Sequence, residues 1–471
     1  MQVRTRPTRR TVLKAAGATA VAASAVVTAT APAVADATGE TAEDAAYDVI
    51  VIGAGFAGIT AARELRAQGN RVLVLEARDR VGGRTWTATH AGHLIERGGT
   101  WVEPTQPHVG AELARYNLEL EEDLPVDRVV FPTPTGPSAF TPDDGFARMG
   151  AVFTRIFDGT RTYFEKPFEP LYRADLLASL DKLTLRDRLD QLALTPAEEL
   201  LVNGQTAVYS GGSSAVGSFT HFAQWWALAG HNDAGWNDTM RWRVKKGTSA
   251  LLNAMIAEGR PTIKLNSPVA SVTDTGQRVH VRLTSGVTYN APRAVVAIPA
   301  NLWPGIKFSP SLPPALTTGG TQGLAVRNAV KLWIHAAKGQ GRVYGQGAET
   351  GTPISLLLPF KETAQGMLYV GFSTDPTLDH TSVPQVEAAV RKLGVDLDII
   401  GLFNHDWGND PYAGGGWTYR KPGQLTTLYP EITNPKGRLA FASGDAANGW
   451  SGYIDGAIES GLRAARQIAA M

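Results

Sequence analysis

Three glycines and one acid near the start of the chain have the spacing of a dinucleotide-binding turn. Gly53, Gly55 and Gly58 follow an apolar run, Tyr47 to Ile52, and precede a segment with helical periodicity. In that context Gly53 permits a tight turn, Gly55 lets the backbone approach a pyrophosphate, and Gly58 lets the helix pack on the strand. Glu76 ends the next apolar run and can accept hydrogen bonds from ribose hydroxyls. The sequence therefore predicts a helix N-terminus that faces a nucleotide, and a ligand-free glycine turn is the alternative.

Four further segments contain glycine, arginine and aromatic residues in a characteristic order. Ala77–Thr85 has the sequence ARDRVGGRT, and 96–106 has the sequence ERGGTWVEPTQ. Near the end of the chain, 441–445 is FASGD and 448–461 is NGWSGYIDGAIESG. These segments resemble the signatures of flavoprotein amine oxidases, and the resemblance extends over essentially all of the chain after the N-terminal segment. The family is the flavin monoamine oxidases, and the pattern is most similar to its exported bacterial nicotine oxidoreductase branch.

The resemblance implies that the nucleotide is FAD and that it is bound noncovalently. Gly416 stands where some members have a cysteine bonded to the flavin, and this chain contains no cysteine at all. The segment 267–269 matches the part of the family that contacts adenine, and Asp445 is expected to hold the ribityl or pyrophosphate region. The residues expected to bind the cofactor are Gly53, Gly55, Phe56, Ala57, Gly58, Glu76, Ala77, Arg78, Gly83, Arg84, Gly99, Thr100, Trp101, Val269, Trp407, Gly444, Asp445, Tyr453, Ile454 and Ala457.

The same resemblance assigns three residues to catalysis. Lys331 lies in the apolar run AVKLWI, which in the family places a lysine near flavin N5, usually through a water. Trp417 ends the segment DPYAGGGW and matches one aromatic wall of the substrate cage, and Tyr453 matches the opposite wall. Two aromatic faces would guide an amine nitrogen toward the flavin. The alternatives are a solvent-facing strand lysine and two ordinary core aromatics.

The predicted fold class is α/β, with a Rossmann-type FAD-binding domain similar to glutathione reductase and an interleaved α+β substrate domain. Residues 46–120, 245–319 and 405–471 are expected to form the FAD-binding domain. Residues 121–244 and 320–404 are expected to form the substrate-binding domain. The resemblance implies this division, because the segments that match the family's cofactor motifs occur at both ends and in the middle of the chain.

Other charged and polar clusters carry weaker signals. The segment 220–226, THFAQWW, is predicted to be a helix over the substrate cavity, although plain core packing is an equal alternative. The acidic runs 121–123 and 143–144 are interpreted as solvated loop charges. His90 and His93 lie in a glycine-containing link between strands, and no metal site is expected there or elsewhere.

Composition narrows the function further. The chain has 471 residues, 43% of them hydrophobic, with 45 basic and 44 acidic side chains. This balance excludes long disorder and gives no support for a nucleic-acid partner. The expected function is oxidation of an amine with an aromatic or hydrophobic body, with electrons passed to O₂ or to an electron-carrier protein. L-Amino-acid or diamine oxidation, a flavin-bearing binding or redox-relay protein, and a homodimeric assembly stay open.

The first 35 residues have the features of an export signal. They contain Arg9 and Arg10, no acidic residue, and an alanine-rich run that ends in Ala33-Val34-Ala35. The segment resembles a twin-arginine signal peptide, which predicts a folded, exported protein in the periplasm or outside the cell, with the twin-arginine translocase as a partner. A disordered basic tail is the alternative.

Overall fold

The computed structural model describes residues 47–471, and its first sheet is built from parallel strands. The strand order is β20-β13-β1-β2-β9, so the start, the middle and the end of the chain share one sheet. Strands covered on both faces become continuous apolar runs rather than alternating patterns, which explains the valine- and isoleucine-rich sequence of β1. These parallel strands are β1 (Val49–Ile52), β2 (Val72–Leu75), β9 (Thr262–Lys264), β13 (Arg293–Val296) and β20 (Leu439–Phe441).

The two faces of this sheet pack against different elements. Val49 and Val51 belong to a core shared with helices, whereas Ile50 and Ile52 belong to a core shared with a four-stranded sheet of order β12-β11-β10-β14. This alternation follows from the period of two along a strand. The helices are α1 (Phe56–Ala67), α2 (Pro107–Arg115), α11 (Thr248–Gly259) and α16 (Ile454–Ala469), and the strands are β10 (Val269–Asp274), β11 (Val279–Leu283), β12 (Thr288–Ala291) and β14 (Lys307–Ser309).

A seven-stranded sheet of order β19-β15-β18-β17-β16-β6-β7 forms the second region, and only the β16–β6 pair in it is parallel. Its strands are β6 (Arg128–Phe131), β7 (Ser138–Phe140), β15 (Val330–Ala337), β16 (Val343–Gln346), β17 (Ile354–Glu362), β18 (Gly366–Ser373) and β19 (Ile399–Asp406).

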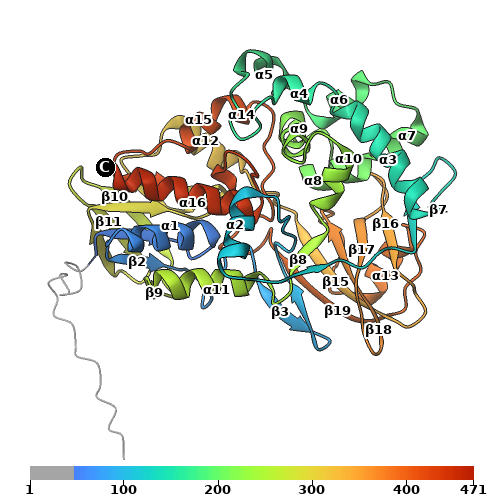
Figure 1. Cartoon of the computed structure of the whole chain (residues 1–471), viewed down its shortest axis with the longest axis horizontal. Helices are drawn as coiled ribbons and strands as arrows, with labels where there is room; N and C mark the ends of the chain where they lie inside the picture. The colour runs from blue at the N-terminus through green and yellow to red at the C-terminus, as the bar shows by residue number, and fades with distance from the viewer. Residues whose placement is uncertain (1–46) are drawn as a thin grey trace, which may run out of the picture. The chain divides into compact units, whose positions relative to one another are not determined.

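Helices cover both faces of this second sheet. A layer of helices lies over one face (Figure 1), and its aromatic residues share a core with Tyr344 and Leu356 of the sheet. On the other face, Val386 and Val390 of α13 (Val383–Arg391) pack on the strands. The helical layer consists of α3 (Pro142–Ile156), α4 (Thr160–Tyr163), α5 (Ala174–Leu180), α6 (Leu185–Gln191), α7 (Pro196–Leu200), α8 (Asn203–Ser210), α9 (Phe219–Leu228) and α10 (Asp233–Asp238).

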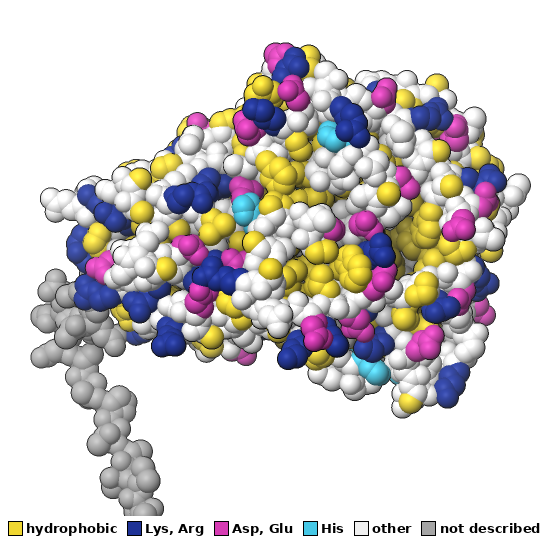
Figure 2. All heavy atoms as spheres, viewed as in Figure 1, with side chains coloured by type: hydrophobic (Ala, Val, Ile, Leu, Met, Phe, Trp, Pro, Cys, Tyr) yellow, Lys and Arg dark blue, Asp and Glu magenta, His cyan; other side chains and the backbone are white. Residues whose placement is uncertain are grey.

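Short elements connect the two regions. Two strand pairs, β3–β4 and β5–β8, are antiparallel and lie close to the predicted cofactor segments. In the view of Figure 2, apolar side chains gather in the hollowed middle of the visible face of the molecule, and most charged side chains lie around this hollow. The connecting elements are β3 (Thr87–His90), β4 (His93–Glu96), β5 (Leu120–Glu122), β8 (Trp242–Val244), η1 (Ala300–Gly305), α12 (Pro314–Gln322), α14 (Gln424–Thr427), α15 (Tyr429–Ile432) and η2 (Gly444–Ala446).

The predicted α/β fold class is confirmed. The expected helix after the glycine turn is present and begins at Phe56, and the last helix runs from Ile454 to Ala469. The predicted domain boundaries stay a prediction, and the predicted signal at 1–35 lies outside the described residues. No helix between residues 47 and 471 is both long enough and apolar enough to cross a membrane.

Candidate active site

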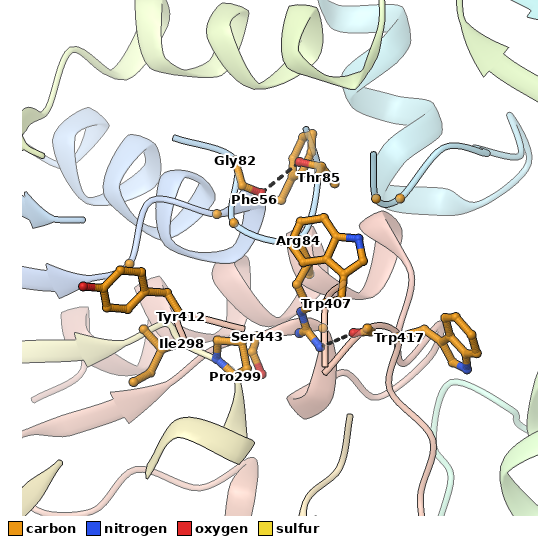
Figure 3. Close-up of a pocket in the computed structure, with 18 of the residues that line it drawn as sticks. Phe56, Gly82, Arg84, Thr85, Ile298, Pro299, Trp407, Tyr412, Trp417 and Ser443 are labelled. Atoms are coloured by element: carbon orange, nitrogen blue, oxygen red, sulfur yellow. Dashed lines mark hydrogen bonds between the residues drawn. The ribbon is translucent and has the colours of Figure 1, made fainter. Parts of the chain in front are cut away.

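A cavity of about 630 Å³ joins the glycine turn of the first region to the aromatic core of the second. Figure 3 shows part of its lining, with Tyr412 and Ile298 toward one end and Trp417 toward the other. This volume lies in the range of cofactor and small-molecule sites, about 300–1,000 Å³. Of all the predicted site residues, only Gly58 and Asp445 do not line it.

The three glycines of the turn have three different steric roles. Gly53 has a φ of +103°, and a side chain there would lie 2.6 Å from the carbonyl oxygen of Ala297. A side chain at Gly58 would lie 2.0 Å from the carbonyl oxygen of Gly53, so this glycine allows α1 to approach the turn. A Cβ at Gly55 would have no other atom closer than 3.9 Å, and the residue lines the cavity. Only Gly55 therefore leaves its open space to a ligand.

The start of α1 is suited to a phosphate. Gly55 caps the helix without a side-chain hydrogen bond, and the first turn contains no acidic residue. Its N–H groups therefore carry partial positive charge toward the cavity. Behind the turn, the buried carboxylate of Glu76 accepts from the backbone N–H of Ala54 at 2.8 Å and of Arg78 at 2.9 Å. Each carboxylate oxygen can accept a further bond, so Glu76 can also bind a sugar hydroxyl.

Asp445 lies behind the cavity wall, so any hold that it has on the ribityl or pyrophosphate region would act through a lining residue. Its fully buried carboxylate pairs with Arg84 at 2.8 Å and accepts from the backbone N–H of Ala300 at 2.9 Å. It also accepts from the hydroxyl of Thr418. Arg84 lines the cavity and donates to the carbonyl oxygen of Gly416 at 3.1 Å (Figure 3). Asp445 therefore positions the arginine that would contact a bound FAD.

A second arginine holds the other end of the loop that carries Trp417. Arg78 donates to Asp410 at 2.5 Å, and the other oxygen of Asp410 lies 3.0 Å from Nε2 of His405. Burial acts to raise the pKa of Asp410, but the His405 hydrogen bond and the Arg78 charge outweigh it and lower the pKa to about 2. The loop 410–417 is thus clamped by two cavity-lining arginines, Arg78 at its start and Arg84 at its end.

Lys331 lies on β15, buried in the cavity wall, with its flanking residues in the sheet core. Its ammonium donates to the carbonyl oxygen of Gly98 at 2.9 Å and to the hydroxyl of Thr100. The rings of Trp101, Trp333 and Phe372 surround it, with centroids 5.1, 5.2 and 5.8 Å from Nζ. Burial lowers the pKa of Lys331 to about 7, while the charges of Glu96 and Asp123 act to raise it. Lys331 therefore lines the cavity, and its predicted place near flavin N5 stays a prediction.

The interpretation of Asp123 as a solvated loop charge is wrong. Trp101 Nε1 donates to its carboxylate at 2.6 Å, and Arg243 pairs with it from β8. Only 15% of the Asp123 side chain is exposed. Neighbouring acidic residues differ here in their surroundings, so their sequence alone is misleading. Glu122 points to solvent, whereas Asp123 turns inward beside β8.

The aromatic end of the cavity contains both predicted walls. Trp417 donates from Nε1 to the carbonyl oxygen of Tyr209 at 2.9 Å and packs edge-on against Phe372 at 6.2 Å. Tyr453 packs edge-on against Trp225 at 5.5 Å, with an interplanar angle of 85°. Each wall is therefore fixed from behind by a neighbour that also lines the cavity.

Segment 220–226 does lie on a helix, α9, and it serves both roles that its sequence allowed. Trp225 lines the cavity, and its Nε1 donates to the carbonyl oxygen of Ser451 at 2.8 Å. Phe222 and Trp226 pack in the core instead. Sequence reasoning did not identify several cavity residues from distant elements, and no local motif marks them: Val208, Tyr209, Thr239, Met240, Leu356 and Phe372.

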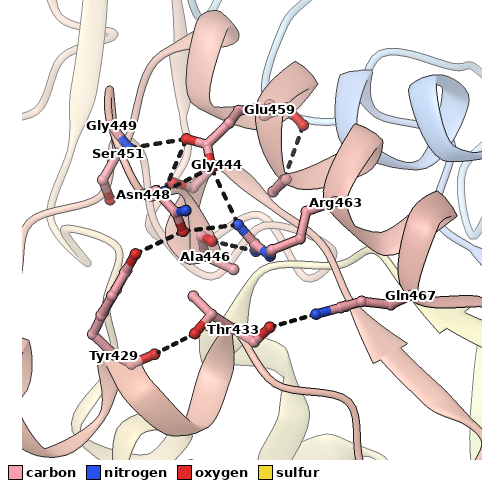
Figure 4. A network of polar contacts seen from close by, with 12 residues as sticks. Tyr429, Thr433, Gly444, Ala446, Asn448, Gly449, Ser451, Glu459, Arg463 and Gln467 are labelled. Atoms are coloured by element: carbon pink, nitrogen blue, oxygen red, sulfur yellow. Dashed lines mark hydrogen bonds and ion pairs between the residues drawn. The ribbon is translucent and has the colours of Figure 1, made fainter. Parts of the chain in front are cut away.

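A polar network fixes the loop that leads into Tyr453 (Figure 4). Glu459 accepts from the backbone N–H groups of Asn448 and Gly449, both at 2.9 Å. Arg463 donates to the carbonyl oxygen of Ala446 at 2.5 Å, and Tyr429 donates to the side chain of Asn448 at 2.6 Å. The C-terminal helix α16 therefore positions Tyr453, the predicted substrate wall, through its buried charged side chains.

Known proteins resemble this chain over most of its length. The family model for flavin containing amine oxidoreductases matches residues 56–469. Pseudooxynicotine dehydrogenase from a Pseudomonas species is 34% identical over 430 residues, which are 90% of this chain and 86% of that protein. Nicotine dehydrogenase from Pseudomonas putida is 32% identical over 428 residues, 90% of this chain and 88% of that protein. The structure of putrescine oxidase bound to putrescine shares the fold, with a TM-score of 0.77 at 22% identity over 90% of this chain and 99% of that one.

Proposed function

The chain belongs to the family of flavin-containing amine oxidoreductases, and on this premise we propose that it is an exported oxidoreductase of amines with an aromatic or hydrophobic body. It is an FAD-dependent enzyme, as the family's chemistry and the dinucleotide turn together require. The proposal concerns the substrate class, the noncovalent attachment of FAD, the electron acceptor and the location of the protein.

The observation that carries the substrate class is the charge pattern of the cavity. Among the described residues that line it, Glu76 is the sole carboxylate, and it lies at the glycine turn. The aromatic end presents Tyr209, Trp225, Met240 and other apolar side chains. A diamine would need an acid at the far end of the pocket, and none of the described lining residues supplies one there. Nicotine-like amines are supported by the names of two relatives, pseudooxynicotine dehydrogenase and nicotine dehydrogenase.

An L-amino-acid substrate is disfavoured because both arginines that line the cavity, Arg78 and Arg84, are already paired with carboxylates. Arg78 is paired with Asp410, and Arg84 is paired with Asp445. Neither guanidinium is free to neutralise a substrate carboxylate without breaking a buried pair, which typically costs several kcal/mol. These two arginines are better suited to the cofactor.

When bound, FAD would supply the acceptor for a hydride from the amine α-carbon, and the protonated imine left behind would be hydrolysed by water to a carbonyl compound. Trp417 and Tyr453 would hold the amine nitrogen between them and exclude water. Desolvation in this apolar cage favours the neutral amine, whose lone pair assists hydride loss. No side-chain base is then required. Lys331 would supply a positive charge at the cavity wall to favour electron transfer to O₂ or to a carrier protein.

Noncovalent attachment is supported by the absence of any cysteine and by Gly416, which lines the cavity next to Trp417. Acid or heat should release intact FAD into the supernatant. Yellow colour that stays on the precipitated protein would contradict this part of the proposal.

Export is supported only by the N-terminal sequence, because residues 1–35 lie outside the described structure. Replacing Arg9 and Arg10 with lysine should keep active holoenzyme inside the cell. Continued secretion through a route for unfolded chains would contradict the twin-arginine assignment.

The decisive experiment for the function is anaerobic mixing with a panel of amines. Nicotine and pseudooxynicotine should bleach the flavin absorbance, whereas putrescine and an L-amino acid should not. Bleaching by putrescine alone would overturn the substrate class. A flavin-bearing binding or redox-relay protein would show no bleaching with any amine in the panel.

A further inference from the structure

We propose that Asp123 is a positioning residue for amine oxidation, which fixes the ring of Trp101 and supplies negative charge behind Lys331. The inference rests on the proposed function, because it concerns the wall between the amine and flavin parts of the cavity. Asp123 is absent from the cavity lining and lies behind it, so it acts through other residues.

Asp123 holds the indole of Trp101 by a hydrogen bond. The indole Nε1 donates to Asp123 at 2.6 Å, and the other carboxylate oxygen pairs with Arg243. The backbone of Trp101 forms a bridge with Arg243, and Val102 donates to the carbonyl oxygen of Trp242 at 2.9 Å. The indole is therefore fixed by its backbone at one end and by a charged hydrogen bond at the other, and charged acceptors form the stronger hydrogen bonds.

The ring contacts continue from Trp101 to the substrate wall. The Trp101 ring lies 6.1 Å from the ring of Phe372, which packs edge-on against Trp417 at 6.2 Å. All three rings line the cavity. Because interiors are close-packed, a rotation of Trp101 would move Phe372 and with it the support of Trp417.

Asp123 also acts on Lys331 through its negative charge. Within residues 47–471, Lys331 forms no ion pair, and its hydrogen-bond partners are the neutral groups of Gly98 and Thr100. The charged and titratable groups around Lys331 come from neighbouring elements. They are Glu96 on β4, Asp123 after β5, Arg243 on β8, and His405, which stands opposite Lys331 on the adjacent strand β19.

Both acids stabilise the positive charge of Lys331, and the contribution of Glu96 is the larger. Glu96 is committed to the start of α11, where it accepts from the N–H of Thr248 at 2.6 Å and its hydroxyl at 2.9 Å. His405 is turned to Asp410. Asp123 instead contacts the indole that lies against the ammonium. Its negative charge is expected to stabilise the protonated form of Lys331 against the cost of burial.

The first experiment measures the ionisation of Lys331 in FAD-loaded enzyme without amine. Lysines labelled with ¹³C at Cε give NMR cross-peaks, and the peak that is missing from Lys331→Met identifies this residue. Asp123→Asn removes the charge and keeps the size of the side chain. The Lys331 titration midpoint is expected to fall by about one pH unit. The measurement needs no turnover, so it is independent of whether any amine bleaches the flavin.

Asp127→Asn is the matched control, because Asp127 is 50% exposed and pairs with Arg342 at the surface. It should leave the midpoint unchanged. An unchanged midpoint in folded, flavin-loaded Asp123→Asn would overturn the charge role of Asp123.

A second variant tests the positioning role from the other side of the contact and still decides the matter if Asp123→Asn does not fold. Trp101→Phe retains a ring but cannot donate to Asp123. The expected result is a several-fold rise in the amine KM with a small change in kcat, while the Lys331 midpoint moves less than in Asp123→Asn. A wild-type KM would overturn the positioning role.

Discussion

Replacing Gly55 with valine is expected to abolish FAD binding while the protein still folds. Gly55 has an extended backbone, with φ −79° and ψ 178°, which valine adopts without strain. The nearest atoms to a Cβ there are 3.9 Å away, so the Cβ itself meets no steric conflict, and Gly55 lines the cavity. The free energy of unfolding should fall by only about 1 kcal/mol, because valine is a poorer helix N-cap residue than glycine.

The effect on the cofactor should be much larger. The valine methyl groups would occupy the space through which the pyrophosphate approaches the backbone. A loss of affinity of roughly 100-fold corresponds to about 2.8 kcal/mol and would leave most of the purified protein colourless. The assay is bound flavin per chain together with thermal unfolding by circular dichroism, with and without added FAD.

Gly58→Ala gives the contrasting result within the same turn. Its Cβ would lie 2.0 Å from the carbonyl oxygen of Gly53, so either α1 or the turn must shift. Overpacking of this kind typically costs 1–3 kcal/mol, and the thermal midpoint should fall with and without FAD. Gly371→Ala is the control, because its Cβ would have nothing closer than 3.7 Å and it lies outside the cavity. Full flavin occupancy in Gly55→Val, or a wild-type midpoint in Gly58→Ala, would refute the reasoning.

The remaining predictions concern the catalytic end and the clamp. Lys331→Met should slow reoxidation of the reduced flavin by O₂, measured by rapid mixing, without loss of FAD. Because burial lowers the pKa of Lys331 to about 7, the wild-type reoxidation rate should decline as pH rises through about 7, and the Met variant should lack that decline. Trp417→Ala and Tyr453→Ala should each slow anaerobic flavin reduction and keep FAD, since an aromatic wall contributes roughly 0.5–1.5 kcal/mol beyond its burial; flavin loss as the main defect would mean that they face the cofactor. In the wild type, reduction should increase with pH through an apparent pKa at or below that of the bound amine, and a flat profile would contradict binding of the neutral form. Asp410→Asn should weaken the hold of Arg78 on the loop and raise both the FAD dissociation constant and the amine KM, measured by flavin fluorescence and steady-state kinetics; a change in neither would show that the clamp is dispensable.

Motifs of adjacent residues led to the cofactor part of the site. The spacing of Gly53, Gly55 and Gly58 is a local property, because a strand–turn–helix places residues two and five positions apart at fixed positions in space. Glu76 follows for the same reason, since parallel strands end at one edge of a sheet. The assignments of Lys331 and Trp417 needed the family resemblance, because a lone strand lysine or tryptophan has no local pattern that marks it as functional.

The tertiary structure alone decided what stands behind and beside these residues. Asp123 and Asp445 both proved to be buried partners of cavity-lining side chains, at separations that no periodicity encodes: Asp123 meets Arg243 across the β5–β8 pair, and Asp445 meets Arg84 from the other end of the chain. The same holds for Tyr209 and Phe372, which come from a helix and a sheet of the second region and meet in one cavity. The sequence determined which short segments could form a nucleotide turn, because backbone geometry depends on neighbours in the chain. Which side chains complete the pocket depends on how sheets and helices pack, and that is settled by close contact between surfaces distant in sequence.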